Sequence, residues 1–242
     1  PEDEMELPPV KIADNVPEEA LRRQNEKIWG MNTQQKKRTI GAYMASVRFM
    51  DQQVGRLLDA LARLNLREET IVIFLSDHGY NLGQHDCWSK VSLWEGSVRT
   101  PVIISVPGQE ENYGTECQAI VEHIDLYPTL TELCGLSGKQ PGILQGESLA
   151  GYLRGEGPGD MEDYAYTVSY NGNDASLRTN RWRYTRWGEG AVMDNEELYD
   201  HKNDPEEYVN LTDDPDNRKI LEKMRNEFEK IREIARTGLQ SE

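Results

Sequence analysis

Apolar side chains recur every three to four positions from Thr33 to Leu64, which predicts one long amphipathic helix. The stripe consists of Ile40, Tyr43, Met44, Val47, Met50, Val54, Leu57, Leu58 and Leu61. Asn32 and Thr33 are suitable caps for its first turn. A short loop then leads into an unbroken apolar run, Ile71 to Leu75, which is typical of a strand buried on both faces. Helix, tight loop and buried strand together predict half of a βαβ unit, whose first strand would lie upstream of Pro1.

A second apolar run, Val102 to Val106, predicts another buried strand after a polar segment. Residues 119–121 have the composition of a short strand. The segment from His123 to Gly135 predicts a helix, with Pro128 in its opening turn and Gly135 ending it. The stretch GESLAGYLRG predicts a further short helix within a loop-rich region.

The pattern changes beyond Gly157, where we place a domain boundary, giving domains 1–157 and 158–242. Short strands separated by Asn, Gly and Asp turns predict an antiparallel meander over residues 164–170, 175–179, 182–187 and 197–199. A last helix, about 216–236, has one apolar face suited to covering such a sheet. The expected fold is α/β: part of a mostly parallel sheet flanked by helices, plus a small C-terminal antiparallel sheet with one helix.

Composition narrows the class of function. The 242 residues include 27 basic and 43 acidic side chains, a net charge of −16, and 37% of the residues are hydrophobic. Sequence-independent nucleic-acid binding requires clustered cations facing phosphate, so the acidic balance argues against it. No apolar run approaches the roughly 20 residues that span a bilayer. We therefore expect a soluble globular protein that binds no nucleic acid and has no membrane span.

The cysteines Cys87, Cys117 and Cys134 show no C-x-x-C spacing, which argues against a zinc ribbon or a disulfide framework. A single bond between Cys117 and Cys134 is one interpretation, and free buried thiols are the other, which we favour. Cysteine usage does not define the compartment.

The first buried strand ends in Ser76-Asp77-His78-Gly79, which is the strongest chemical feature of the chain. A carboxylate beside an imidazole offers an oxygen and a nitrogen ligand to a divalent cation. The alternative is an Asp that caps a turn and a His satisfied by backbone groups, and the tripeptide alone does not choose between them. The strand before it and the glycine after it favour a metal, with the remaining ligands coming from elsewhere.

Lys90 lies thirteen residues after Asp77 and could neutralise an anionic oxygen of a substrate, although a lone lysine is more often a solvated surface residue. His85 could donate a proton or a hydrogen bond to the substrate, or be structural. We favour the structural role because no spacing selects it.

The segment SDHGYNLGQHDCWSK, followed by SLWEGSVRTPVIISVPG, resembles the carboxyl-terminal half of type I sulfatases in the alkaline phosphatase superfamily, with the iduronate-2-sulfatase-like branch nearest. The segments YMASVRFMDQQVGRLLDAL, HIDLYPTLTELCGL and LRTNRWRYTRW…ELYDHKNDPEEYVNL resemble the family in the same order. The resemblance covers nearly the whole chain.

The resemblance implies a sulfuric ester hydrolase acting on a sulfated carbohydrate. Asp77 and His78 would bind Ca²⁺, with Mg²⁺, Mn²⁺ or Zn²⁺ as alternatives; Lys90 would contact the sulfate, and Tyr80 would lie at the rim of the substrate pocket. The family's nucleophile is a formylglycine made from Cys or Ser in a C-x-P-S-R-like motif. An exported, periplasmic or lysosomal setting is implied, and a cytoplasmic one stays open.

The sequence departs from the family in lacking that motif, the paired Asp-Asp strand end and the K-P-H type segment. We expect them in an N-terminal half upstream of Pro1 or on a partner chain, so that this chain alone is inactive. Two alternatives remain: a phosphodiesterase or phosphonate hydrolase of the same superfamily, and a non-catalytic sulfatase-like module.

Overall fold

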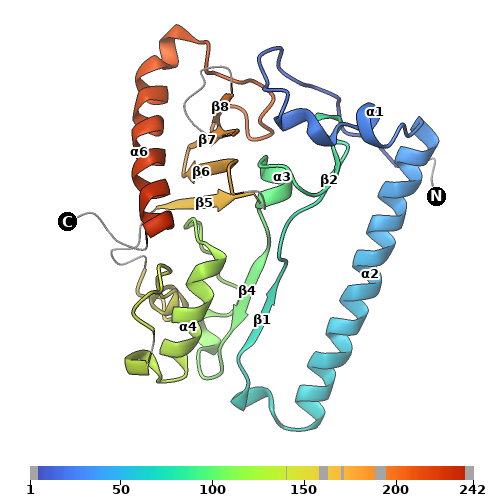
Figure 1. Cartoon of the computed structure of the whole chain (residues 1–242). Coiled ribbons are helices and arrows are strands. Elements are labelled where there is room, and N and C mark those ends of the chain that lie inside the picture. Colours follow the sequence, from blue (N-terminus) through green and yellow to red (C-terminus); the bar gives the residue numbers. More distant parts are fainter. Residues whose placement is uncertain (1–4, 140, 158–162, 170–171, 189–194, 238–242) are drawn as a thin grey trace. The chain divides into compact units, whose positions relative to one another are not determined.

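A computed structural model describes residues 5–139, 141–157, 163–169, 172–188 and 195–237. The chain forms two compact units (Figure 1). The first unit comprises Pro1–Ile12 and Glu18–Glu110, and the second comprises Ala13–Pro17 and Glu111–Glu242. The expected domain boundary near Gly157 adjoins residues 158–162, which lie outside the described part, and it stays a prediction. Within the described residues, no helix combines the length and the apolar composition needed to cross a bilayer.

The first unit is dominated by α2 (Thr33–Arg63), which confirms the predicted long helix. Its start is fixed by a reciprocal cap: Gln35 N donates to Asn32 Oδ1 and Asn32 N donates to Gln35 Oε1, both at 2.9 Å. The short helices η2 (Ala20–Arg23) and α1 (Asn25–Ile28) precede it. Ile40 is the one buried side chain of α2, so most of its apolar stripe faces outward.

The strands β1 (Val72–Leu75) and β4 (Val102–Ser105) confirm the two apolar runs as strands. They pair antiparallel, with Val72 opposite Ser105 and Leu75 opposite Val102. We expected a parallel arrangement, and the described residues contain no parallel pair. The connection from β1 to β4 explains the difference, because it holds a hairpin and a one-turn helix rather than the long crossover helix of a βαβ unit.

Burial of these strands also differs from the expectation. Leu75 is 39% exposed and Ile103 is 61% exposed, so neither strand is buried on both faces. Apolar side chains of both strands therefore stay exposed within the described part of the chain.

The connection between β1 and β4 holds short elements that the sequence patterns did not predict. They are β2 (Asn81–Leu82), η4 (Gln84–Asp86), β3 (Trp88–Ser89) and α3 (Glu95–Val98). Another short helix, η3 (Arg67–Glu69), precedes β1. β2 and β3 form a small antiparallel hairpin. These two-residue strands are too short to show any alternation of polar and apolar side chains.

In the second unit, the helix expected from His123 to Gly135 is confirmed as η6 (His123–Asp125) and α4 (Leu126–Leu133). The short helices η5 (Glu110–Asn112), η7 (Ser137–Lys139) and α5 (Ala150–Leu153) are also present. The strand predicted over residues 119–121 is wrong: this segment is irregular. The nearby edge-strand amide of Tyr166 donates instead to the side chain of Glu122, at 2.7 Å.

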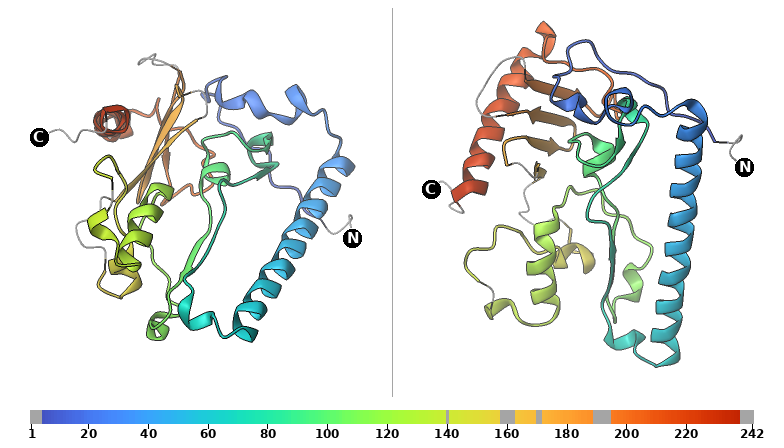
Figure 2. Two further views of the ribbon diagram at one scale, coloured as in Figure 1. Left: turned by 60° about the horizontal axis from the view of Figure 1, so that its bottom comes forward. Right: turned by 45° about the vertical axis from the view of Figure 1, so that its right-hand side comes forward.

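The antiparallel meander is confirmed, with strand order β5-β6-β7-β8. Its strands are β5 (Tyr164–Val168), β6 (Ala175–Thr179), β7 (Trp182–Arg186) and β8 (Glu196–Asp200). The helix α6 (Arg218–Thr237), preceded by η8 (Pro215–Asn217), covers one face of this sheet, as the left view of Figure 2 shows with α6 seen end-on in red. The α/β class with a small antiparallel sheet and one covering helix is thus as expected.

The core of the second unit lies between α6 and the sheet. Leu177, Tyr184 and Leu198 are fully buried on the sheet, and Phe228 of α6 is 1% exposed. The Phe228 ring meets the edge of Tyr184, with ring centroids 5.2 Å apart. Burial raises the pKa of Tyr184, and the hydrogen bond that its hydroxyl donates to Glu196 adds to the rise.

Candidate metal and anion site

The turn after β1 fixes how Asp77 and His78 are presented. The amide of Gly79 donates to Ser97 O at 2.7 Å. A Cβ at Gly79 would lie 2.2 Å from Gly96 O, which is far inside van der Waals contact. Glycine is therefore required here by the close approach of two backbone segments, and it holds the end of β1 against the start of α3.

The imidazole of His78 is oriented by its own turn. His78 Nδ1 donates to Gly79 O at 2.8 Å, which leaves Nε2 with its lone pair. Asp77 Oδ2 lies 3.6 Å from this Nε2, and the Asp77 side chain is 85% exposed. An oxygen and a nitrogen at this separation can both contact one divalent cation, so these two residues fit part of a metal site. They do not complete one, because such cations take at least four ligands.

Lys90 lies beside this pair. Its ammonium Nζ is 3.2 Å from His78 Nε2 and donates to that lone pair. The sequence placed Lys90 thirteen residues from Asp77 with no argument from spacing, and the fold brings the two close together. A carboxylate, an imidazole nitrogen and an ammonium group thus converge at one partly exposed point of the first unit.

The segment that carries Lys90 is strained. Ser89 and Val91, on either side of it, have φ values of 76° and 73°, and His85 and Asp86 have φ values of 54° and 53°. Positive φ is unfavourable for residues with a Cβ and is exceptional for β-branched valine. Strained backbone of this kind concentrates at binding and catalytic sites, where the surrounding contacts enforce it.

Contacts within the first unit hold this strained segment. Lys36 of α2 forms an ion pair with Asp86, with 2.9 Å between Nζ and Oδ1 and both side chains largely shielded. The backbone of Cys87 forms a β-bridge with Gln24. His85 is 3% exposed, and its ring stacks on Trp94 with centroids 4.2 Å apart. This packing favours the structural role for His85.

Two residues near the site were given no role from the sequence. Asn81 is 1% exposed and donates to the hydroxyls of Ser92 and Ser97, at 3.1 and 2.8 Å. Tyr43 of α2 stacks on Tyr80, with ring centroids 5.2 Å apart and both rings partly exposed. Both lie in segments that resemble the family, but their residue types did not single them out, and only the fold brings them beside the DHG turn.

None of the three cysteines supplies a side chain to the group formed by Asp77, His78 and Lys90. None of them forms a disulfide: Cys87 is buried, as favoured, whereas Cys117 and Cys134 are exposed. The expectation of buried thiols is therefore wrong for these two: Cys134 lies in the turn after α4 and Cys117 in an irregular segment.

Two family models match the chain. The sulfatase model covers residues 12–136, and the model of the N-sulphoglucosamine sulphohydrolase C-terminal region covers residues 83–234. Among curated relatives, a sulfatase of Formosa agariphila is 33% identical over 85% of this chain and 38% of its own length. A choline-sulfatase of Rhizobium meliloti is 33% identical over 74% of this chain and 34% of its own length. The chain thus spans little more than a third of the length of these relatives.

Solved structures agree. A 2-O GAG sulfatase superposes with a TM-score of 0.77 and 27% identity over 95% of this chain and 53% of that one. A phosphonate monoester hydrolase of Agrobacterium radiobacter superposes with a TM-score of 0.74 over 88% of this chain and 44% of that one; at 23% identity, this likeness shows the fold alone. The chain belongs to the sulfatase family of the alkaline phosphatase superfamily.

Proposed function

We propose that this chain supplies the metal-binding and sulfate-binding part of a sulfuric ester hydrolase. The observation that carries the proposal is the convergence of Asp77, His78 and Lys90, with Lys90 Nζ 3.2 Å and Asp77 Oδ2 3.6 Å from His78 Nε2. Such a group can hold a cation and, next to it, an oxyanion. Membership of the sulfatase family supports sulfate as the anion.

In this proposal each residue has a separate task. Asp77 and His78 hold a divalent cation, which when bound polarises the oxygens of the sulfate group. Lys90 donates to a sulfate oxygen and stabilises the negative charge that develops there. The strain on both sides of Lys90 pre-orients its side chain, so little reorganisation is needed when the anion arrives. Tyr80, stacked on Tyr43, forms the rim past which the substrate enters.

We propose Ca²⁺ as the resident metal, with Mg²⁺, Mn²⁺ or Zn²⁺ as alternatives. The exposed carboxylate of Asp77 suits a hard cation, whereas the single imidazole is compatible with the softer ones. Metal content of the purified whole protein, measured by mass spectrometry, tests this assignment. Asp77→Asn is expected to release the metal, and Asp59→Asn, on an exposed part of α2, is the matched control.

A further segment completes the site in this proposal, either from the same protein or from a partner chain. The outward apolar stripe of α2, including Met44 at 55% and Leu57 at 67% exposure, and the open faces of β1 and β4 support it, because apolar surface of this extent normally lies against protein. The formylglycine nucleophile and the remaining metal ligands would lie there. This chain by itself is then inactive towards sulfate esters.

We propose a sulfated carbohydrate as substrate and the iduronate-2-sulfatase-like branch as the subgroup. Support comes from relatives that are described as an ulvan-active sulfatase, at 31% identity, and a 2-O GAG sulfatase. A small non-sugar sulfate ester is the competing substrate class in this proposal, because one relative is a choline-sulfatase. The family resemblance also supports an exported, periplasmic or lysosomal setting.

The decisive experiment compares turnover by the whole protein that contains this chain with turnover by the chain alone, using a chromogenic aryl sulfate and a sulfated disaccharide. We expect the whole protein to be active, the chain alone to be inactive, and Lys90→Ala to lower kcat at least about 100-fold by removing one stabilising charge. Lys219→Ala, on the exposed part of α6, is the matched control. Turnover by the 242-residue chain alone would refute the proposal that another segment is required.

The same assay separates the alternatives. A phosphonate monoester or phosphodiester hydrolysed faster than any sulfate ester, together with bound zinc or manganese, would identify the related hydrolase. No turnover of any of these esters by the metal-loaded whole protein would leave a non-catalytic sulfatase-like module.

A further inference from the structure

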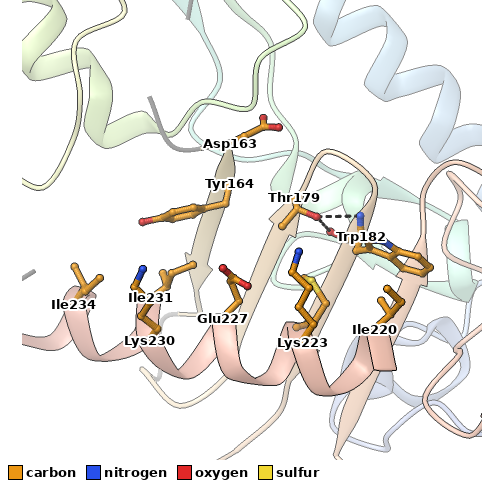
Figure 3. A pocket seen from close by; sticks show the side chains of 11 residues that line it. Asp163, Tyr164, Thr179, Trp182, Ile220, Lys223, Glu227, Lys230, Ile231 and Ile234 are labelled. Atoms are coloured by element: carbon orange, nitrogen blue, oxygen red, sulfur yellow. Dashed lines mark hydrogen bonds between the residues drawn. The ribbon is translucent and has the colours of Figure 1, made fainter. Parts of the chain in front are cut away.

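A pocket of about 340 Å³ opens between α6 and the sheet of the second unit, separate from the DHG turn (Figure 3). Its floor is apolar and includes Met224 and Ile231, which also belong to the core. Tyr164, at the start of β5, lies over the helix from the strand side. A concave, mostly apolar site with a few converging polar groups is the usual form of a small-molecule site.

Three charged side chains of α6 line the pocket. Lys223, Glu227 and Lys230 all point from the helix toward the strands, with the carboxylate between the two ammonium groups (Figure 3). The lysines are seven residues apart, so about two turns, or about 10 Å of helix, separate them. Both are exposed, and within the described part of the chain neither forms an ion pair.

The local charge contrasts with that of the whole protein. α6 carries seven basic and four acidic residues, whereas the full sequence has 27 basic and 43 acidic residues. The charged lining of the pocket is balanced, with Lys223 and Lys230 against Asp163 and Glu227, so the pocket lacks the acidic excess of the whole chain. Its two ammonium groups are therefore where an anionic ligand with an apolar face would be held. A sugar ring has such a face, sulfate or carboxylate substituents provide the anions, and hydroxyl groups can donate to Glu227.

We propose that this pocket is an accessory binding site for a sulfated saccharide segment. Lys223 and Lys230 hold anionic substituents of neighbouring sugar units, Glu227 accepts from a hydroxyl, and Tyr164, Met224 and Ile231 contact the ring. The choice of ligand rests on the proposed sulfatase function, and the site would bind a part of the polymer that is not being hydrolysed.

The first test observes the pocket directly. The full chain, with ¹³C-labelled methionine methyl groups, is titrated with a sulfated glycosaminoglycan tetrasaccharide at low ionic strength, on a Lys90→Ala background that weakens binding at the DHG turn. We expect the Met224 methyl resonance to shift and those of Met44 and Met50, on α2, to stay in place. An unchanged Met224 resonance at saturating tetrasaccharide would overturn the proposal.

The second test measures affinity by calorimetry. The double variant Lys223→Ala/Lys230→Ala should bind the tetrasaccharide about tenfold more weakly, since two exposed charge contacts are lost. Lys202→Ala/Lys219→Ala removes the same charge from exposed positions outside the pocket and should change affinity less than twofold. Equal weakening in both double variants, or equal binding of the desulfated tetrasaccharide, would contradict the assignment.

Neither measurement needs turnover, so the two proposals can fail separately. If the Met224 resonance shifts but the protein hydrolyses no sulfate ester, only the sulfatase proposal is refuted. If the protein hydrolyses a sulfate ester but its Met224 resonance does not shift with the tetrasaccharide, only the accessory-site proposal is refuted.

Discussion

The two units differ in how far they bury their apolar side chains. In the second unit, α6 buries Leu221, Met224, Phe228 and Ile231 against four strands. In the first unit, a helix of 31 residues buries Ile40 alone and leaves residues such as Leu57 exposed. The same helical periodicity thus marks a buried face in one unit and an open face in the other. The unit with the open face also holds the strained segment around Lys90.

The largest expected effect tests this contrast between cores. Phe228→Ala should lower the free energy of unfolding by about 3–5 kcal/mol, because it removes a fully buried ring that packs on Tyr184. Leu57→Ala, on the open face of α2, should cost less than about 0.5 kcal/mol in this chain. Urea denaturation followed by circular dichroism gives both values. Equal losses would mean that α2 is buried in solution.

The next effect concerns the turn that presents the metal ligands. Gly79→Ala places a Cβ 2.2 Å from Gly96 O, so the first unit should lose about 2–3 kcal/mol as the backbone is forced apart. Gly41→Ala is the matched control: nothing lies within 4 Å of its Cβ, and inside α2 it should stabilise by about 1 kcal/mol. Amide hydrogen exchange of β1 and α2 residues reports each change where it occurs. A neutral Gly79→Ala variant would mean that the two backbone segments separate at no cost, so that their contact does not fix the turn.

The spacing of apolar residues predicted those helices and strands that are long enough to show a repeat. α2, α6 and the four strands of the meander were found with ends correct to within a few residues, because each presents a repeated apolar face. The hairpin β2–β3 was missed because two residues per strand show no alternation. The pairing of β1 with β4 could not be predicted from either run, since strand direction is decided by the length and structure of the connection.

The site was predictable only where residue type carries the chemistry. Asp77 and His78 were singled out because a carboxylate and an imidazole follow a strand, and Lys90 through the family resemblance. The contact between Lys36 and Asp86 could not be foreseen, because it joins residues 50 apart through the path of the chain. The positive φ values around Lys90 were equally hidden, since Ser89 and Val91 are not residue types that favour them.

A smaller effect belongs to an ion pair of the second unit. Hydrogen bonds from Arg181, both at 2.7 Å, lower the pKa of the Asp200 carboxyl, with contributions from Lys202 N and Asn203. The pKa of Asp200 is lower in the folded state than in the unfolded state, where it is about 4. Ionised Asp200 therefore stabilises the fold at pH values above about 4, and this stabilisation is lost as the pH falls through the pKa of the folded state. Asp200→Asn should cost about 2 kcal/mol at pH 7 and progressively less in acid. Asp216→Asn, at an exposed position, should leave the pH profile of urea stability unchanged. A constant difference between Asp200→Asn and the parent protein from pH 7 to pH 2 would contradict this linkage.

The smallest effect returns to the strained segment and has the opposite sign. Val91 has a φ of 73° and is 41% exposed, so Val91→Gly relieves strain while losing little packing. Relief of about 1–3 kcal/mol outweighs a backbone entropy cost of about 0.5–1 kcal/mol, and a net gain of about 0.5–1 kcal/mol is expected. Val209 is 54% exposed and has no positive φ, so Val209→Gly relieves no strain and should lower stability through the backbone entropy cost. If the strain orients Lys90, the more stable Val91→Gly variant should also bind sulfate more weakly, which calorimetry with inorganic sulfate would measure. A variant that gains stability and keeps its sulfate affinity would mean that the strain belongs to the packing of the loop and not to the binding of the anion.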